Sequence, residues 1–139
     1  MSEAHELQAA DFLGGRARLI TFSLKSDERG DLLPIPFDEL PFVPRRVFAV
    51  AGVPIGTHRG GHAHRSGEQL LICLQGRVEL LMRVENATER LVLGAGGTAL
   101  LIGPGVWCRQ TYLDPDTVLL ALTSEPYDPS SYVEQSAWR

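Results

Sequence analysis

The sequence predicts a single all-β domain, built as a sandwich or a small barrel. Its 139 residues fit one domain and are enough to bury a sizeable core. The chain contains 14 glycines and 9 prolines, which interrupt regular helices and favour turns. Between these residues, short apolar runs recur about every ten positions, a spacing that is typical of many short strands.

The predicted strands follow one another with turn signals between them. Residues 27–31 (Asp-Glu-Arg-Gly-Asp) indicate a turn, and four prolines between residues 34 and 44 exclude a regular helix there. Gly76, between two apolar runs, predicts a tight hairpin. The expected strands are 16–24, 46–53, 69–75, 77–84, 90–93, 98–102 and 117–123. Residues 54–67 are expected to form a loop, and residues 129–135 a short terminal helix.

Charge and composition exclude several classes of function. The chain has 13 Lys and Arg against 17 Asp and Glu, a formal net charge of −4, whereas nucleic-acid binding usually needs a basic face. No apolar run reaches the ~18 residues of a membrane span, and the start lacks the features of a signal peptide. Two cysteines, Cys73 and Cys108, do not make a disulfide framework. We therefore expect a cytoplasmic protein with neither nucleic acid nor membrane as a partner.

Residues 54–67 carry three of the four histidines of the chain. His62 and His64 are two residues apart, so an extended backbone would direct both side chains to one face. Two imidazoles on an inward face can share a metal ion or flank one small substrate. The alternative is a pair of loop histidines that bond only to water or to the backbone.

The spacing around the histidines resembles the first signature of the cupin family. The matching residues are Gly56, His62, His64, Gln69 and Gly76, with Gln69 standing where cupins have Glu. A weaker second signature runs from Gly97 to Cys108, where cupins usually have His. The resemblance implies a jelly-roll β-barrel, also called a double-stranded β-helix, over residues 16–139. Residues 1–15 would form an N-terminal extension, and the site would lie inside the barrel mouth.

The residues at the cupin ligand positions make a metal questionable. Metal-binding cupins use three histidines and one glutamate, and the corresponding residues here are His62, His64, Gln69 and Cys108. Gln69 offers only a neutral carbonyl oxygen, which does not offset the charge of a dication. A Cys108 thiolate would complete a mixed set that suits zinc, whereas a small buried hydrophobe is the other role of a cysteine. We expect no metal and no cofactor, with the zinc site as the alternative.

Two neutral imidazoles side by side suit proton transfer between adjacent atoms of one substrate. Their ordinary pKa of about 6.5 lets them take and give protons near neutral pH. A keto–enol tautomerisation needs this ability, because a proton leaves one carbon and another arrives at its neighbour. A second histidine or an arginine can stabilise the enediolate oxygen that forms in between, and Arg59 is a candidate.

Longer motifs extend the resemblance over nearly the whole chain. They are Asp-Glu-Arg-Gly at 27–30, Arg-Arg-Val at 45–47, Arg-Gly-Gly-His-Ala-His-Arg at 59–65, Gly-Pro-Gly-Val-Trp at 103–107 and Ser-Glu-Pro-Tyr-Asp at 124–128. This set is similar to the sugar-nucleotide 3,4-ketoisomerases, also called WxcM-like cupins. The resemblance implies a metal-free isomerase that moves the ketone of dTDP-4-keto-6-deoxyglucose from C4 to C3 through an enediol, in deoxyamino-sugar biosynthesis. It also implies a homodimer, with Phe12, Phe22 and Trp138 as candidates to cover the interface.

The resemblance implies roles for individual residues. His62 would be the base near the C3 proton, and His64 would help to return a proton at C4. Arg29 would contact the sugar, and Arg59 would face the diphosphate. The other substrate-binding candidates are Gln69, Trp107 and Cys108. For the tryptophan, packing in the core is an equal alternative.

Three positions depart from the ketoisomerase pattern. Phe48 and Ala49 stand where the family usually has aromatic hydroxyls, and Leu101 stands where it has another tyrosine. Each change removes a hydroxyl from the expected pocket, and the loss of such donors should change the accepted substrate. The alternatives are therefore a non-catalytic cupin that binds a sugar nucleotide, a metal-dependent cupin with another substrate, and a 3,5-epimerase of the same keto-sugar.

Overall fold

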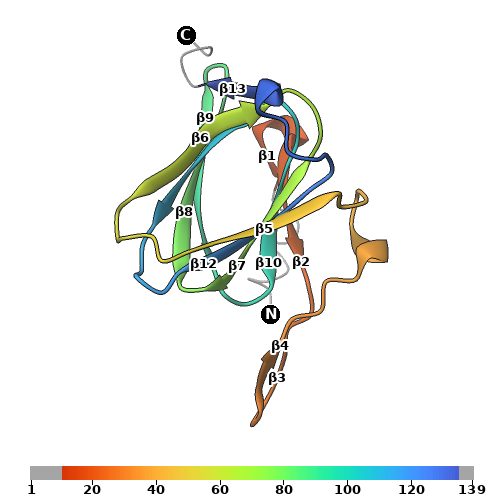
Figure 1. The fold of residues 1–139 in the computed structure, drawn as a ribbon, viewed down its shortest axis with the longest axis vertical. Coiled ribbons are helices and arrows are strands. Elements are labelled where there is room, and N and C mark those ends of the chain that lie inside the picture. Colours follow the sequence, from red (N-terminus) through yellow and green to blue (C-terminus); the bar gives the residue numbers. More distant parts are fainter. Residues whose placement is uncertain (1–10, 135–139) are drawn as a thin grey trace.

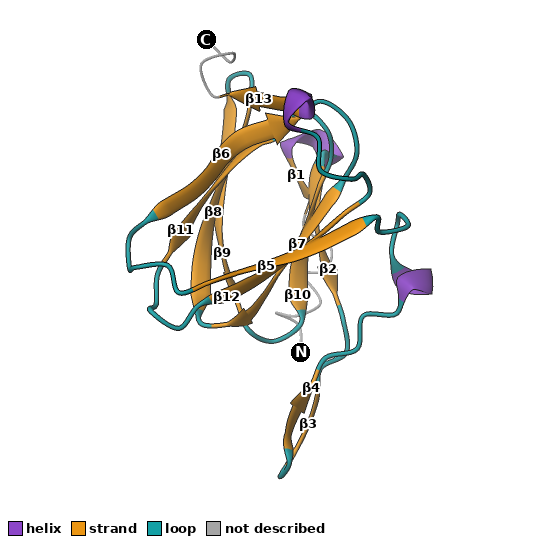
Figure 2. Ribbon diagram, viewed as in Figure 1, coloured by secondary structure: helices purple, strands orange, loops and turns teal. Residues whose placement is uncertain are grey.

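The computed structural model describes residues 11–134, which form a barrel of two antiparallel sheets (Figure 1, Figure 2). The six-stranded sheet has the order β1 (Asp11–Phe12), β2 (Ala17–Thr21), β10 (Thr98–Ile102), β7 (Gln69–Gln75), β12 (Val118–Thr123) and β5 (Arg46–Ala51). The five-stranded sheet has the order β13 (Tyr132–Glu134), β6 (His58–His64), β11 (Trp107–Tyr112), β8 (Arg77–Val84) and β9 (Ala87–Gly94). Except for the pairs β1–β2 and β8–β9, neighbouring strands come from distant parts of the chain, as in a jelly roll.

Helical structure in the described residues is limited to three 3₁₀ turns, at Leu13–Gly15, Phe37–Glu39 and Pro129–Ser131. The predicted all-β jelly roll is therefore confirmed. None of these short turns has the length and apolar character needed to cross a membrane.

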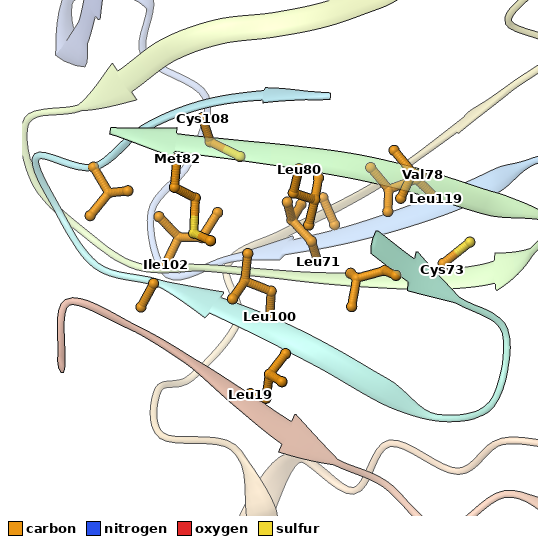
Figure 3. Close-up of a cluster of buried hydrophobic side chains, with 14 of the residues drawn as sticks. Leu19, Leu71, Cys73, Val78, Leu80, Met82, Leu100, Ile102, Cys108 and Leu119 are labelled. Carbon is orange, nitrogen blue, oxygen red and sulfur yellow. The ribbon is translucent and has the colours of Figure 1, made fainter. Parts of the chain in front are cut away.

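Apolar side chains from both sheets fill the space between them. On the inner strands every second residue points inward, as a pleated backbone requires. This alternation gathers Leu71, Leu80, Leu100 and Leu119 into one buried cluster (Figure 3). The cluster holds the two sheets together and closes one end of the interior.

A second apolar cluster covers the outer face of the six-stranded sheet. Leu70, Ile72 and Leu101 point outward there and are buried under the segment 33–42. Leu101 faces out because it alternates with Leu100 and Ile102, which face the core. The expectation that Leu101 removes a hydroxyl from the pocket is therefore wrong.

A hairpin stands away from the barrel at its N-terminal side (Figure 1). It consists of β3 (Lys25–Asp27) and β4 (Gly30–Leu32), and all six strand residues are exposed. At its tip, Arg29 donates to the carboxylate of Asp27 at 2.6 Å in an exposed ion pair. The turn predicted at residues 27–31 is confirmed as the tip of this hairpin.

Two strands of the smaller sheet differ from the sequence prediction. Residues 58–64 of the expected loop form β6, and β11 was not predicted at all. Glycines interrupt β6, and the inward positions of β11 include Cys108 and Gln110. Neither strand therefore shows the apolar alternation from which strands are predicted.

The two ends of the chain also differ from the prediction. The helix expected at residues 129–135 is wrong, because only Pro129–Ser131 are helical and Tyr132–Glu134 pair with β6 at the edge of the sheet. Within the expected extension of residues 1–15, β1 pairs with β2. Residues 1–10 and Trp138 lie outside the described residues.

Candidate active site

A cavity of about 300 Å³ lies between β5 of the larger sheet and β6 and β11 of the smaller one. Five of the seven predicted site residues line it, namely Arg59, His62, His64, Gln69 and Cys108. Arg46, Phe48 and Gln110 line it too. This space is termed the mouth cavity. It borders the apolar cluster around Leu71, since Val106 and Cys108 belong to the cluster and also line the cavity.

A bulge in β6 directs both Arg59 and His62 into the mouth cavity. The two residues are three positions apart, so a regular strand would point them to opposite faces. The pairing of β6 with β11 places His62 opposite Cys108 and Arg59 opposite Gln110, with one extra residue on β6 between the two pairs. The extra residue reverses the alternation, so both side chains reach the inner face.

Gly60 and Gly61 form this bulge. Their φ angles are +79° and +81°, a region that favours glycine. A Cβ at Gly60 would lie only 3.1 Å from the backbone oxygen of Cys108. Adjacent glycines inside a strand are a signal of a bulge, so this feature could have been recognised from the sequence.

His62 and His64 lie side by side on the inner face of β6. Their ring centroids are 5.8 Å apart, with an angle of 81° between the ring planes. Burial lowers the pKa of His64 from its usual 6.5. The charges of His62 and Arg46 lower it further, while Glu125 raises it. His64 is therefore neutral at pH 7 and can accept a proton.

Gln110 extends the polar wall of the mouth cavity. Its side-chain oxygen accepts a hydrogen bond of 2.9 Å from the hydroxyl of Tyr112, which is fully buried in the core. Burial raises the pKa of Tyr112 to about 12, so the hydroxyl keeps its proton and remains a donor. With its oxygen occupied, Gln110 has its amide N–H groups left to donate to a ligand. Gln110 belongs to no motif that the sequence analysis identified. Its position two residues after Cys108, on the same face of a strand, is the one signal that could have predicted it as a site residue.

Cys108 does not complete a metal site. Its side chain lies beside Met82 at the edge of the apolar core (Figure 3), and burial raises its pKa to about 12. Without a metal the thiol therefore keeps its proton, which zinc binding would have to displace. Among the described residues, no three His, Cys, Asp or Glu side chains are grouped so that they could hold a metal ion. Because Gln69 adds only a neutral oxygen, the donor set does not fit a dication.

Two predicted site residues lie outside the mouth cavity. Trp107 is buried on the outer face of the smaller sheet with Ala63 and Leu81. It faces out because the next residue on β11, Cys108, faces in, so core packing is its role. Arg29 lies at the tip of the exposed hairpin (Figure 1), and the fold does not bring it to the mouth cavity of its own chain.

A family model and a curated relative match most of the chain. The family model described as "FdtA: WxcM-like, C-terminal" matches residues 16–137. A curated TDP-4-oxo-6-deoxy-alpha-D-glucose-3,4-oxoisomerase from Aneurinibacillus thermoaerophilus is 31% identical over 119 residues, which cover 85% of this chain and 86% of the relative.

Solved structures of two similar proteins share the fold. A mutant of the 3,4-ketoisomerase QdtA from Thermoanaerobacterium thermosaccharolyticum, in complex with TDP-4-keto-6-deoxyglucose, has a TM-score of 0.83 and 32% identity. The match covers 88% of this chain and 89% of that one. A 3,4-ketoisomerase from Helicobacter canadensis has a TM-score of 0.81 and 26% identity over 87% of this chain and 92% of that one. Together with the family match over nearly the whole described barrel, these likenesses confirm the resemblance predicted from the motifs, and the chain belongs to the WxcM-like FdtA family of cupin-fold proteins.

Proposed function

We propose that this protein is a sugar-nucleotide 3,4-ketoisomerase that acts on dTDP-4-keto-6-deoxyglucose. The observation that carries the proposal is the pair His62 and His64 on one wall of a cavity that also holds two arginines. The similar proteins are 3,4-ketoisomerases, and one of them was solved with TDP-4-keto-6-deoxyglucose. Imidazoles beside guanidinium groups suit a dianionic nucleotide sugar that has to exchange a proton.

The reaction exchanges a ketone and a hydroxyl on neighbouring carbons. His62 removes the proton from C3, and the electron pair forms the double bond of an enediolate whose charge rests on the oxygen of C4. The neutral ring of His64 takes the proton of the C3 hydroxyl as C3 becomes the ketone, and it passes this proton to C4. The protonated His62 gives its proton to the oxygen on C4, so both rings return to their starting form. The protons and electrons balance, so the step needs no oxidant or reductant.

The protonation state of His64 supports its role in this mechanism. A neutral imidazole has one nitrogen that accepts a proton and one N–H that donates. The lowered pKa of His64 keeps this form at neutral pH. The ring of His64 is therefore able to accept the proton that its step requires.

The other residues of the mouth cavity bind the substrate in this proposal. Arg59 is exposed at the edge of the cavity and binds the diphosphate, whose charge a guanidinium matches with paired hydrogen bonds. Gln69 and Cys108 line the cavity from two different strands and contact the hexose.

Incubation with dTDP-4-keto-6-deoxyglucose in deuterated water, followed by NMR of the sugar ring, tests the proposal. We expect a 3-keto product with deuterium at C4 and exchange of the C3 proton in the remaining substrate. The absence of both a new keto-sugar and exchange at C3 would overturn the proposal. Exchange at C5 as well would identify a 3,5-epimerase. Elemental analysis of the purified protein should find less than ~0.1 metal ion per chain. A tight metal site would stay loaded during purification and give a much higher value.

A non-catalytic cupin that binds a sugar nucleotide is the second candidate function. The observation in its favour is Phe48, which lines the mouth cavity without the hydroxyl expected of the family. Calorimetry with dTDP would then show binding, while the deuterium experiment would show no exchange.

The proposed enzyme is a cytoplasmic homodimer. Among the described residues, nine large apolar side chains are exposed, and five of them lie between residues 24 and 47: Leu24, Leu32, Phe37, Val43 and Val47. Phe12 and Phe22, considered for the interface from the sequence, pack against their own chain, so the exposed set is the better candidate. Cys73 and Cys108 form no disulfide, which agrees with a reducing compartment. Light scattering on the purified protein measures the number of chains.

A further inference from the structure

Arg46 is the second cation of the mouth cavity, and the mechanism above gives it no role. It is the first residue of β5. Its guanidinium carbon lies 4.6 Å from the ring centroid of Phe48 and 4.9 Å from that of Tyr127. Such cation–π contacts hold the guanidinium against the faces of the two rings. The N–H groups lie in the guanidinium plane, so they remain able to donate to another group.

No carboxylate in the described part of the chain forms an ion pair with Arg46. Glu125 lines a small adjoining pocket together with Arg46 and His64, but its carboxylate accepts a hydrogen bond of 2.9 Å from the hydroxyl of Ser66. The charge of Arg46 is therefore not committed to a fixed partner. It is available to a negative charge that forms inside the cavity.

The two arginines of the mouth cavity lie at opposite ends of the histidine pair. Along β6 the inward side chains follow in the order Arg59, His62, His64. Arg59 is level with Gln110 on the neighbouring strand. Arg46 lies at the other end, where its charge acts on His64 and both residues line the adjoining small pocket. The histidines thus lie between the two cations.

In this reaction two groups of the nucleotide sugar carry negative charge that a cation can stabilise. Its diphosphate is charged from binding to release, whereas the enediolate is charged only between the two proton transfers. Arg59 is exposed at the cavity edge and suits the first group. Arg46 is half-buried beside His64 and is held in place by two rings, which suits the second, because a fixed donor costs no reorganisation during the reaction.

We propose that Arg46 is the electrophilic catalytic residue, which donates hydrogen bonds to the enediolate oxygen as its charge develops. The inference rests on the proposed isomerase function, since it concerns the intermediate of that reaction. It assigns a role to a residue that lies 16 positions before His62 in the sequence and that only the fold brings to the site.

Four variants test this role. Arg46→Gln removes the charge, and Arg46→Lys keeps it without the planar donors. Arg59→Gln removes the other cation of the cavity. Arg45→Gln is the matched control, because Arg45 is the exposed neighbour on the chain and does not line the mouth cavity. For each protein, steady-state kinetics give kcat and KM, and calorimetry gives the Kd for dTDP.

We expect Arg46→Gln to lower kcat about 100- to 1,000-fold, the effect of removing one donor to a developing oxyanion, with the dTDP Kd unchanged. Arg46→Lys should recover part of kcat because it restores the charge. Arg59→Gln should instead raise the dTDP Kd about tenfold, as a lost charge-assisted hydrogen bond does, with a smaller change in kcat. Arg45→Gln should match the unsubstituted protein.

Two results would overturn the inference. One is a kcat of Arg46→Gln within about threefold of the parent, whether or not the affinity for dTDP falls. The other comes from Tyr127→Leu, which removes one ring and leaves the guanidinium. If Tyr127→Leu reproduced the whole loss in kcat and Arg46→Lys recovered none of it, Arg46 would act only by holding the segment after β12. An inactive parent protein would overturn the proposed function together with this inference, whereas an active parent with a fully active Arg46→Gln variant would overturn this inference alone.

Discussion

The two ends of the barrel interior are built by the same strands but contain opposite kinds of side chain. β7 contributes Gln69 to the mouth cavity and, two residues later, the fully buried Leu71 to the core. β5 contributes Arg46 to the cavity, and Val50 to the place where the cavity meets the core. The apolar end supplies the free energy of folding, and the polar end remains open to ligand. Substitutions at the two ends should therefore affect different properties.

At the polar end, His62→Ala should have the largest effect on activity. We expect kcat to fall about 1,000-fold, within the range of a lost general base. The free energy of unfolding should change by less than about 1 kcal/mol, because the half-buried ring belongs to the cavity wall and not to the core. His58→Ala is the control on the same strand, since His58 is exposed and bonded to Thr111 at 2.7 Å. Full activity in His62→Ala would remove the proposed base.

At the apolar end, Leu71→Ala should have the largest effect on stability. Leu71 is fully buried, and removing such a side chain costs about 2–5 kcal/mol of the free energy of unfolding. Leu74→Ala, on the same strand at a site that is 42% exposed, should cost much less. Urea unfolding measures both variants. Equal losses would mean that the core around β7 does not hold the sheets together.

The same contrast explains which strands could be predicted from the sequence. The strands at residues 69–75, 77–84 and 98–102 were predicted with their observed bounds, because apolar residues on the core face dominate their pattern. β6 and β11 were missed because their inward positions carry the chemistry of the site. A strand that lines a polar cavity lacks the alternation that marks a strand beside a core.

The predicted site shows a similar division. The local signature around His62, His64 and Gln69 predicted residues that do line the mouth cavity. Arg46 and Gln110 could not be found in this way, because the pairing of distant strands brings them to the histidines. Trp107 was a substrate-binding candidate with core packing as an equal alternative, and alternation from Cys108 places it in the core.

The bulge in β6 affects both stability and substrate binding, so Gly60→Ala should disturb both properties. Alanine would have to adopt a φ of +79° with its Cβ 3.1 Å from the backbone oxygen of Cys108, a cost of about 1–3 kcal/mol. Any shift of the bulge also moves Arg59, so KM for the nucleotide sugar should rise. Gly52→Ala is the matched control, because Gly52 has a φ of +72° and nothing within 4 Å. If both variants lost equal stability, the close contact at Gly60 would contribute nothing.

The smallest expected effect is a shift in the pH dependence of activity. His64 has a pKa below 6.5 because of burial first, then the charges of His62 on its own strand and of Arg46 on β5. Glu125, in the segment after β12, acts in the opposite direction, and Cys108 on β11, with a pKa of about 12, stays uncharged throughout. Because the neutral ring is the active form, kcat/KM should decline only below pH 6.5 as the ring takes up a proton. Glu125→Gln removes a charge that raises this pKa, so the decline should move to lower pH.

Arg46→Gln removes a charge that lowers the pKa of His64, so the NMR titration of the His64 ring should move to higher pH in this variant. Glu79→Gln is the control for both changes, because Glu79 pairs with Arg90 away from the mouth cavity and should leave the titration unchanged. The two shifts have opposite signs, which an indirect effect through loosened packing would not produce. Shifts of the same sign in the Glu125 and Arg46 variants would mean that solvent exposure, and not the local charges, controls the histidine.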